Sequence, residues 1–338
     1  MEYLMEQPIN DPFSDALARL LSQECTPDMV RRIEAGGSAD TLWNVLEASG
    51  FANALLPAAK GGAELSMTEA FALFELCGTH VLPLPLAETM VARMLLASAN
   101  YDIPAGSITL SVATRYGDRI RCGAVAFGAV SDHVLAADAS GNAYLLPAAI
   151  ARKNPDVFPL DAGLDWDIGL LGSMPRIAFG ELRTLHACLC TAHLCGALQA
   201  TLSRTLSYAN ERLQFGRAIG AFQAIQHQLS VMAEHVFASR IAAQLGCRGP
   251  LKDLSRLAIA VAKILTSEAA QEATSIAHAI HGAVGLSAEH DLQLFTRRLY
   301  WGRRTAGSEG YWHDVLGDAL LASECRAIDM IREIGDIH

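Results

Sequence analysis

The chain has 338 residues, of which 51% are apolar and only 18% are charged. Such a composition can bury a large core, so it excludes a disordered or fibrous protein. The 36 acidic and 26 basic side chains give a formal net charge of -10, which argues against binding along a nucleic-acid backbone as the main function.

The first part of the chain, residues 1–102, is predicted to form a small helical domain. Its apolar residues recur at helical spacing, as at Ala70, Leu73 and Phe74. Prolines and a pair of adjacent glycines interrupt this pattern and indicate turns between short helices.

The middle part, residues 103–180, is predicted to form a small antiparallel β domain. Short β-rich runs such as His133–Ala137 and Arg176–Phe179 are separated by Gly, Asp and Pro. At about 75 residues this domain is short for one that must hold a cofactor by itself.

The last part, residues 181–338, is predicted to be a bundle of long helices. Ala221–Leu245 has no Gly or Pro and carries an apolar stripe at steps of three and four. Further helices are predicted at Leu251–His281, around His290–Trp301 and from about Tyr311 to Ile334. Long helices joined by short turns form a bundle, so the expected fold class is mainly α with a small middle β domain.

Residues 184–203 contain no Asp, Glu, Lys or Arg and are about as long as a membrane-spanning helix. The segment holds two histidines and three cysteines, and charged residues follow it without a helix breaker. It is therefore interpreted as a helix buried on nearly all sides in a bundle, with no membrane insertion.

The eight cysteines are scattered and form no CxxC pair. A metal or thiolate site is conceivable where Cys188 and Cys190 lie near His186, but residues two apart point to different faces of a helix. Core packing in a reducing cytoplasm is the preferred interpretation, with no metal. The N-terminus carries Glu2 and Glu6 and lacks an apolar signal segment, so nothing indicates export.

The most specific residues lie in the run ERLQFGRAIGAFQAIQH, residues 211–227. An arginine and a Gln-Phe-Gly turn between two helices offer guanidinium and backbone N–H donors to a pyrophosphate. Gln223 and Gln226, one turn further, could contact polar atoms of a ribose or adenine. The alternative is an exposed, capped turn without a ligand.

This run closely resembles the signature of the acyl-CoA dehydrogenase flavoprotein family. Further blocks resemble that family in the same order, at residues 56–62, 83–89, 262–270, 281–286, 289–292 and 297–298. The resemblance therefore covers nearly the whole chain.

The resemblance implies FAD as cofactor, an acyl-CoA as substrate and electron-transfer flavoprotein as electron acceptor. In the family, a glutamate removes the α-proton of the thioester while hydride leaves the β-carbon for the flavin. The signature segment grips the adenine-diphosphate half of an FAD whose flavin lies mainly against the neighbouring subunit. Carried over to this sequence, the cofactor-binding positions are Arg212, Gln214, Phe215, Gln223 and Gly282.

The catalytic glutamate of the family has no counterpart at its two usual positions. Alignment by counting places Ala306 at the commoner position and His186 at the rarer one. Glu309 is a candidate for a displaced base, although a glutamate at a helix N-terminus more often stabilises the helix dipole. His186 could act as a base near neutral pH, but an isolated histidine in an apolar helix is more often a core residue.

Other flavin-contacting blocks of the family are also missing from the β domain, and Ala279 replaces a family glutamine. This asymmetry resembles the shorter subunit of heteromeric α2β2 acyl-CoA dehydrogenases of bacterial steroid side-chain degradation. The sequence therefore predicts a subunit that lends FAD contacts to a partner carrying the base. The alternatives are a homomeric dehydrogenase with a relocated base and a non-catalytic CoA-thioester-binding or structural relative. A steroid, linear or aromatic acyl chain is equally compatible with the sequence.

Overall fold

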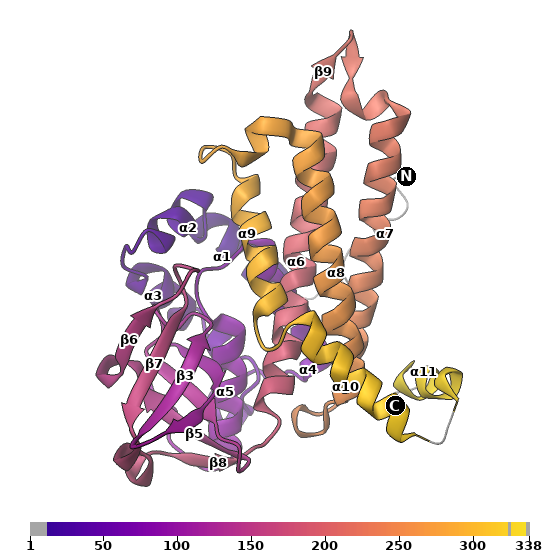
Figure 1. Ribbon diagram of the computed structural model, residues 1–338. Helices are drawn as coiled ribbons and strands as arrows, with labels where there is room; N and C mark the ends of the chain where they lie inside the picture. Colours follow the sequence, from indigo (N-terminus) through magenta and orange to yellow (C-terminus); the bar gives the residue numbers. More distant parts are fainter. Residues whose placement is uncertain (1–11, 324–325, 336–338) are drawn as a thin grey trace.

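The computed structural model describes residues 12–323 and 326–335 and shows three regions along the chain (Figure 1). The first region consists of helices joined by short turns, and α4 opens with a capping box between Ser66 and Glu69. Its elements are α1 (Pro12–Glu24), α2 (Pro27–Glu34), α3 (Asp40–Ala48), the 3-10 turns η2 (Phe51–Asn53) and η3 (Ala58–Lys60), α4 (Met67–Thr79) and α5 (Leu86–Ser98).

The second region contains two four-stranded sheets that pack face to face around an apolar core. One sheet has the order β1 (Ile108–Val112), β4 (His133–Ala137), β5 (Asn142–Pro147) and β8 (Arg176–Ala178). The other has the order β2 (Thr114–Tyr116), β3 (Arg119–Val125), β7 (Ala162–Asp167) and β6 (Arg152–Pro155).

The expectation of an antiparallel β domain needs one correction. β1 pairs with β4 in parallel, with Ile108 opposite His133, whereas every other described pair is antiparallel. The physical reason is the connection: the chain leaves β1 to build β2 and β3 of the other sheet before it returns, and such a crossover permits parallel pairing.

The third region is a helical bundle with a small β-hairpin at one tip (Figure 1). Its elements are α6 (Leu182–Glu211), β9 (Leu213–Gln214), β10 (Arg217–Ala218), α7 (Gln223–Gly246), α8 (Arg256–His281), α9 (Leu292–Arg304), α10 (Glu309–Ala322) and α11 (Ala327–Gly335). The mainly α fold class with a small β region is thus confirmed.

Two predicted helices differ in their limits. The one expected from residue 251 begins at Arg256, because Ser255 caps it by accepting a hydrogen bond from Ala258 N. The one expected over 311–334 is two helices, since the chain becomes extended at Ser323.

Helix α6 forms the centre of the bundle. Of the described helices it is the one long and apolar enough to cross a membrane, yet 94% of its apolar window is buried inside the protein, as in a core helix. It crosses α4 very closely: a Cβ added at Gly78 would lie 1.9 Å from His193 O, and one added at Gly196 would lie 1.9 Å from Glu75 O. Glycine on both helices is therefore required for this crossing.

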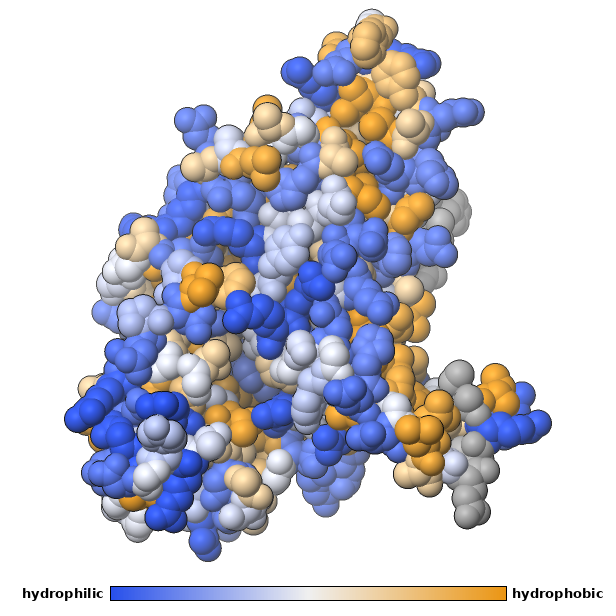
Figure 2. Space-filling model, in the orientation of Figure 1, coloured by the Kyte–Doolittle hydropathy of each residue, from blue (hydrophilic) through white to orange (hydrophobic). Residues whose placement is uncertain are grey.

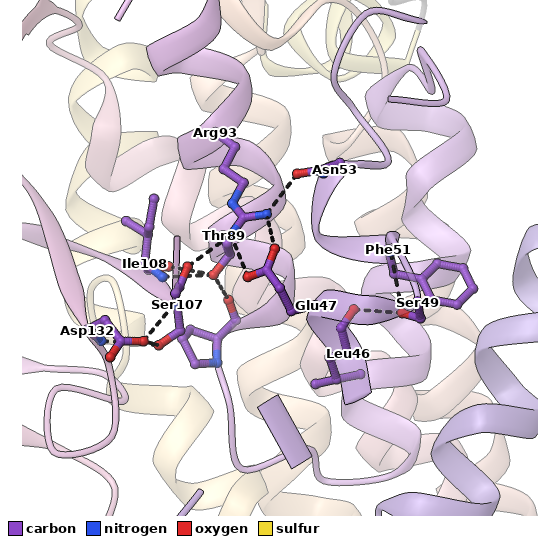
Figure 3. Close-up of polar contacts among 12 residues, drawn as sticks. Leu46, Glu47, Ser49, Phe51, Asn53, Thr89, Arg93, Ser107, Ile108 and Asp132 are labelled. Atoms are coloured by element: carbon purple, nitrogen blue, oxygen red, sulfur yellow. Dashed lines mark hydrogen bonds and ion pairs between the residues drawn. The ribbon is translucent and has the colours of Figure 1, made fainter. Parts of the chain in front are cut away.

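Helix α5 joins the N-terminal helices to the first sheet (Figure 3). The Arg93 guanidinium donates to both carboxylate oxygens of Glu47, at 2.7 Å each, and to Asn53 Oδ1 at 2.8 Å. On the same helix, Thr89 Oγ1 accepts a hydrogen bond from Ile108 N at 2.9 Å. The Arg93 contacts therefore tie α5 to α3 and η2, and the Thr89 contact ties α5 to β1.

Candidate functional site

A cavity of about 400 Å³ opens where the β domain meets the bundle. Its walls come from β1 and β3, the loop before β7, the first turns of α6, and the end of α9 with the turn that follows. The lining residues are Leu110, Ser111, Val112, Gly123, Ala124, Ala126, Asp156, Phe158, Asp161, Leu182, Arg183, His186, Trp301, Arg304, Thr305, Ala306, Gly307 and Tyr311.

Both positions at which a family base was expected line this one cavity. Ala306 lies in the turn after α9 with a φ of 58°, and Gly307 follows with a φ of 113°. The Ala306 side chain is a methyl group, so that position carries no acid or base. His186 lies on the first turns of α6 and is 6% exposed.

The turn that carries Ala306 is supported from behind by a lysine. Lys263 of α8 is 0% exposed, and its Nζ donates to Gly302 O at 2.9 Å and Arg303 O at 3.0 Å. These carbonyls belong to the last turn of α9, where a cation complements the helix dipole. Burial lowers the pKa of Lys263, and the nearby Cys190 and Glu309 oppose that change.

Two cavity carboxylates were missed by the sequence reasoning. Asp161 accepts hydrogen bonds from Trp301 Nε1 at 2.7 Å and from Phe127 N at 3.1 Å, so both its oxygens are engaged. Burial raises the pKa of Asp161 to about 6. Asp156 is half-buried, and its Oδ1 accepts from Val157 N at 2.6 Å. Neither residue lies in a run that resembles a functional motif.

A third missed carboxylate, Glu88 of α5, lies behind His186. It is 1% exposed, and its Oε1 lies 3.8 Å from His186 Nε2 and 3.9 Å from His193 Nδ1. Burial raises the pKa of Glu88 to about 7 and lowers those of His186 and His193 to about 4 and about 3. A glutamate inside the apolar stretch Leu86–Ala97 is the signal that could have revealed it.

Glu309 lies outside the cavity lining. It is the first residue of α10, follows the cap Ser308, and its Oε1 is 2.5 Å from Arg303 Nε. Its carboxylate is therefore engaged in an ion pair at a helix N-terminus, where it also complements the helix dipole.

The predicted cofactor residues lie at the other end of the bundle, on the β9–β10 hairpin and its flanks (Figure 1). Arg212 ends α6, Gln214 lies in β9, and Gln223 opens α7. Phe215, with a φ of 52°, forms the turn with Gly216 and is 90% exposed. The structure thus brings these four positions together, far from the cavity of the same chain.

The fifth predicted position, Gly282, ends α8 with a φ of 64°. Beside it, the His281 ring stacks on Tyr208 of α6 with 4.3 Å between ring centroids. A polar groove of about 490 Å³ lies here, lined by Ser203, Arg204, Ser207, Tyr208, Glu211, His281, Glu289, His290 and Asp291. Gly282 therefore flanks the end of α6 that leads into the hairpin.

The cysteines of α6 are buried and free. Within residues 12–323 and 326–335 no group of three or more His, Cys, Asp or Glu side chains is placed to hold a metal ion. Cys325 lies outside the described residues.

Residues 178–321 match the family model of the acyl-CoA dehydrogenase C-terminal domain. The chain is also 27% identical over 308 residues to acyl-CoA dehydrogenase IpdE2 of Mycolicibacterium smegmatis. The aligned region covers 87% of this chain and 93% of that protein. The C-terminal part of the chain, residues 178–321, belongs to the acyl-CoA dehydrogenase family.

Solved structures share the fold of this chain over nearly its whole length. The ChsE4–ChsE5 complex from Mycobacterium tuberculosis contains a chain with a TM-score of 0.79 and 20% identity, covering 93% of this chain and 97% of that one. A variant of the Tcur3481–Tcur3483 steroid ACAD gives a TM-score of 0.77 and 23% identity, with coverage of 92% and 97%. At these identities the likeness shows the fold.

Proposed function

We propose that this chain is a subunit of an FAD-dependent acyl-CoA dehydrogenase. It lends contacts to the adenine-diphosphate half of a neighbouring subunit's FAD, and a partner chain supplies the catalytic glutamate. The proposal rests on one observation. The hairpin presents exposed hydrogen-bond donors at one end of the molecule, whereas the cavity at the other end has Ala306 where the family's catalytic glutamate was expected.

The hairpin residues have the chemistry that a dinucleotide diphosphate requires. Arg212, Gln214 and Gln223 are exposed, and within the described chain none of their side chains forms a hydrogen bond or ion pair. A guanidinium can bind a phosphate through two parallel hydrogen bonds, and the amides can bind ribose or adenine. Bound FAD would accept the hydride that leaves the β-carbon of the thioester.

Apolar surface on the bundle supports assembly with other subunits. Figure 2 shows apolar side chains over the hairpin tip and along the α7 side of the bundle. They include Leu213, Phe215, Phe237 and Ile241, which are 68%, 90%, 39% and 60% exposed. A patch of this kind is typical of a surface covered by another chain.

Two of the similar structures contain pairs of chains, ChsE4 with ChsE5 and Tcur3481 with Tcur3483. That pairing supports an α2β2 assembly for this chain as well. By the same family analogy we propose an acyl-CoA substrate, a steroid-type acyl group and electron-transfer flavoprotein as electron acceptor. The free buried cysteines suit a cytoplasmic location.

Co-expression with a neighbouring acyl-CoA dehydrogenase gene product tests the proposal. The expected product is a complex with equal numbers of the two chains and two FAD per tetramer, measured by native mass spectrometry and flavin absorbance. The control is this chain expressed alone, which should bind little FAD. A yellow, active homotetramer of this chain alone would refute the shared-site proposal.

Glu309 provides a separate prediction, because a homomeric enzyme would need a relocated base. Replacing Glu309 by glutamine should leave the kcat of the complex within about twofold, since this carboxylate is paired with Arg303 and lies outside the cavity lining. Activity and FAD content are measured on the same sample. A loss of activity with full FAD content would favour the homomeric alternative.

A further inference from the structure

The cluster of Glu88, His186 and His193 is unusual because all three side chains are buried and each has at least one polar atom without a hydrogen-bond partner. Glu88 Oε1 and Oε2, His186 Nε2 and His193 Nε2 are buried and make no hydrogen bond. Leaving a buried carboxylate without a donor destabilises a protein, so such groups in a cavity wall are candidates for function.

His186 connects this cluster to the cavity. Its Nε2 faces Glu88 at 3.8 Å, while the residue lines the cavity. His193, at a similar distance from the same carboxylate, is not among the cavity-lining residues. Glu88 can therefore act on a bound ligand through His186.

We propose that His186 is an acid–base residue in this chain's own cavity and that Glu88 is its positioning residue. The ligand class, an acyl-CoA thioester, rests on the proposed function. His186 removes a proton from the α-carbon, the C–H electron pair forms the C=C bond of the enolate, and the carbonyl π pair moves onto the thioester oxygen. The imidazolium exchanges its proton with solvent and returns a proton to the same carbon. The exchange conserves atoms and electrons and needs no flavin.

The surroundings of His186 suit this role. Its imidazole is neutral at pH 7, because burial and then the charge of Lys263 lower its pKa, and a neutral imidazole has a lone pair for the proton. Once protonated, it forms an ion pair with Glu88, whose carboxylate oxygens accept no hydrogen bond from the described residues. Arg183 and Arg304 line the same cavity and would stabilise an enolate oxygen.

The other acids of the cavity are less suited to this step. Asp161 has both oxygens engaged by Trp301 and Phe127. Asp156 is half-buried and has no charged partner among the described residues. The variant Asp156→Asn tests whether Asp156 is the base instead of His186.

The test is hydrogen–deuterium exchange at the α-carbon of butyryl-CoA and phenylacetyl-CoA in D₂O, followed by mass spectrometry. It uses the full chain alone, because the glutamate proposed for the partner chain would itself exchange the α-proton. Binding of each thioester is measured first by calorimetry. We expect exchange about 100-fold above the buffer rate, abolished in His186→Gln. Glu88→Gln should reduce exchange by roughly 10-fold at unchanged thioester affinity, and Glu88→Asp should restore part of it.

His133→Gln is the control, because it removes a half-buried imidazole of β4 that neither lines the cavity nor belongs to the cluster, and it should leave exchange within about twofold. Circular dichroism verifies that each variant is folded. Exchange that survives His186→Gln, or that is lost equally in His133→Gln or Asp156→Asn, overturns the inference. Binding of a thioester without exchange, or failure to bind either thioester, overturns the inference alone. The proposed function is tested separately by the subunit ratio and FAD content of the co-expressed complex.

Discussion

Replacing Lys263 by alanine is expected to lower the free energy of unfolding by about 3 kcal/mol. The fully buried ammonium holds Gly302 O and Arg303 O at the end of α9, and its removal leaves both carbonyls without this donor beside a new void. The loss should also loosen the turn that carries Ala306. Chemical denaturation of the purified chain or complex measures the effect.

Methionine at the same position separates the two contributions. Lys263→Met fills most of the volume but supplies no donor, so it should cost about 1–2 kcal/mol, less than alanine. Equal losses in the two variants would show that the lost hydrogen bonds account for the effect. A loss below about 1 kcal/mol in the alanine variant would contradict the structural role of Lys263.

Replacing Arg212 by alanine should greatly weaken FAD binding in the complex. A charged hydrogen-bonding group is worth about 2–3 kcal/mol, which corresponds to a rise in the FAD Kd of roughly 30- to 150-fold. Because Arg212 lies far from this chain's own cavity, the lost flavin should be the one that neighbours the partner chain. Flavin fluorescence on titration of the apo-complex measures the Kd.

Arg217 is the matched control on the same hairpin. It is also exposed, and its guanidinium stacks on the Phe222 ring at 4.1 Å from the centroid. Its replacement by alanine should change the Kd by no more than about fivefold, since an exposed charge contributes about 1 kcal/mol or less. If both variants lose FAD equally, general positive charge rather than a specific phosphate contact explains the binding. An unchanged Kd in Arg212→Ala would remove the hairpin from the cofactor site.

Local patterns predicted the order of helical, β and helical regions because periodicity and breakers act over short stretches of chain. These patterns did not predict a strand that forms only through a tertiary contact, or a helix start that depends on one capping residue. The exposed polar segment Arg152–Pro155 gives no β signal, yet it pairs with β7. Ser255 sets the start of α8 through one hydrogen bond, which the uninterrupted apolar pattern did not show.

The candidate site, too, was predictable from the sequence only in part. The sequence identified Arg212, Gln214, Phe215 and Gln223 as one group, since they are neighbours on a hairpin and its flanks. A glutamate inside an apolar stretch marks Glu88 as unusual, but the sequence could not show that it faces His186, because Glu88 comes from another part of the chain and reaches His186 only through packing of α5 against α6.

By itself, the sequence determined the fold class, the resemblance to the acyl-CoA dehydrogenase family and the absence of a glutamate at position 306, because each depends on residue identity and short-range spacing. The tertiary structure decided that Ala306 and His186 line one cavity, that the hairpin lies far from it, and that a buried carboxylate faces His186. These are long-range juxtapositions. They arise from side-chain packing between segments far apart in the chain, which no local pattern encodes.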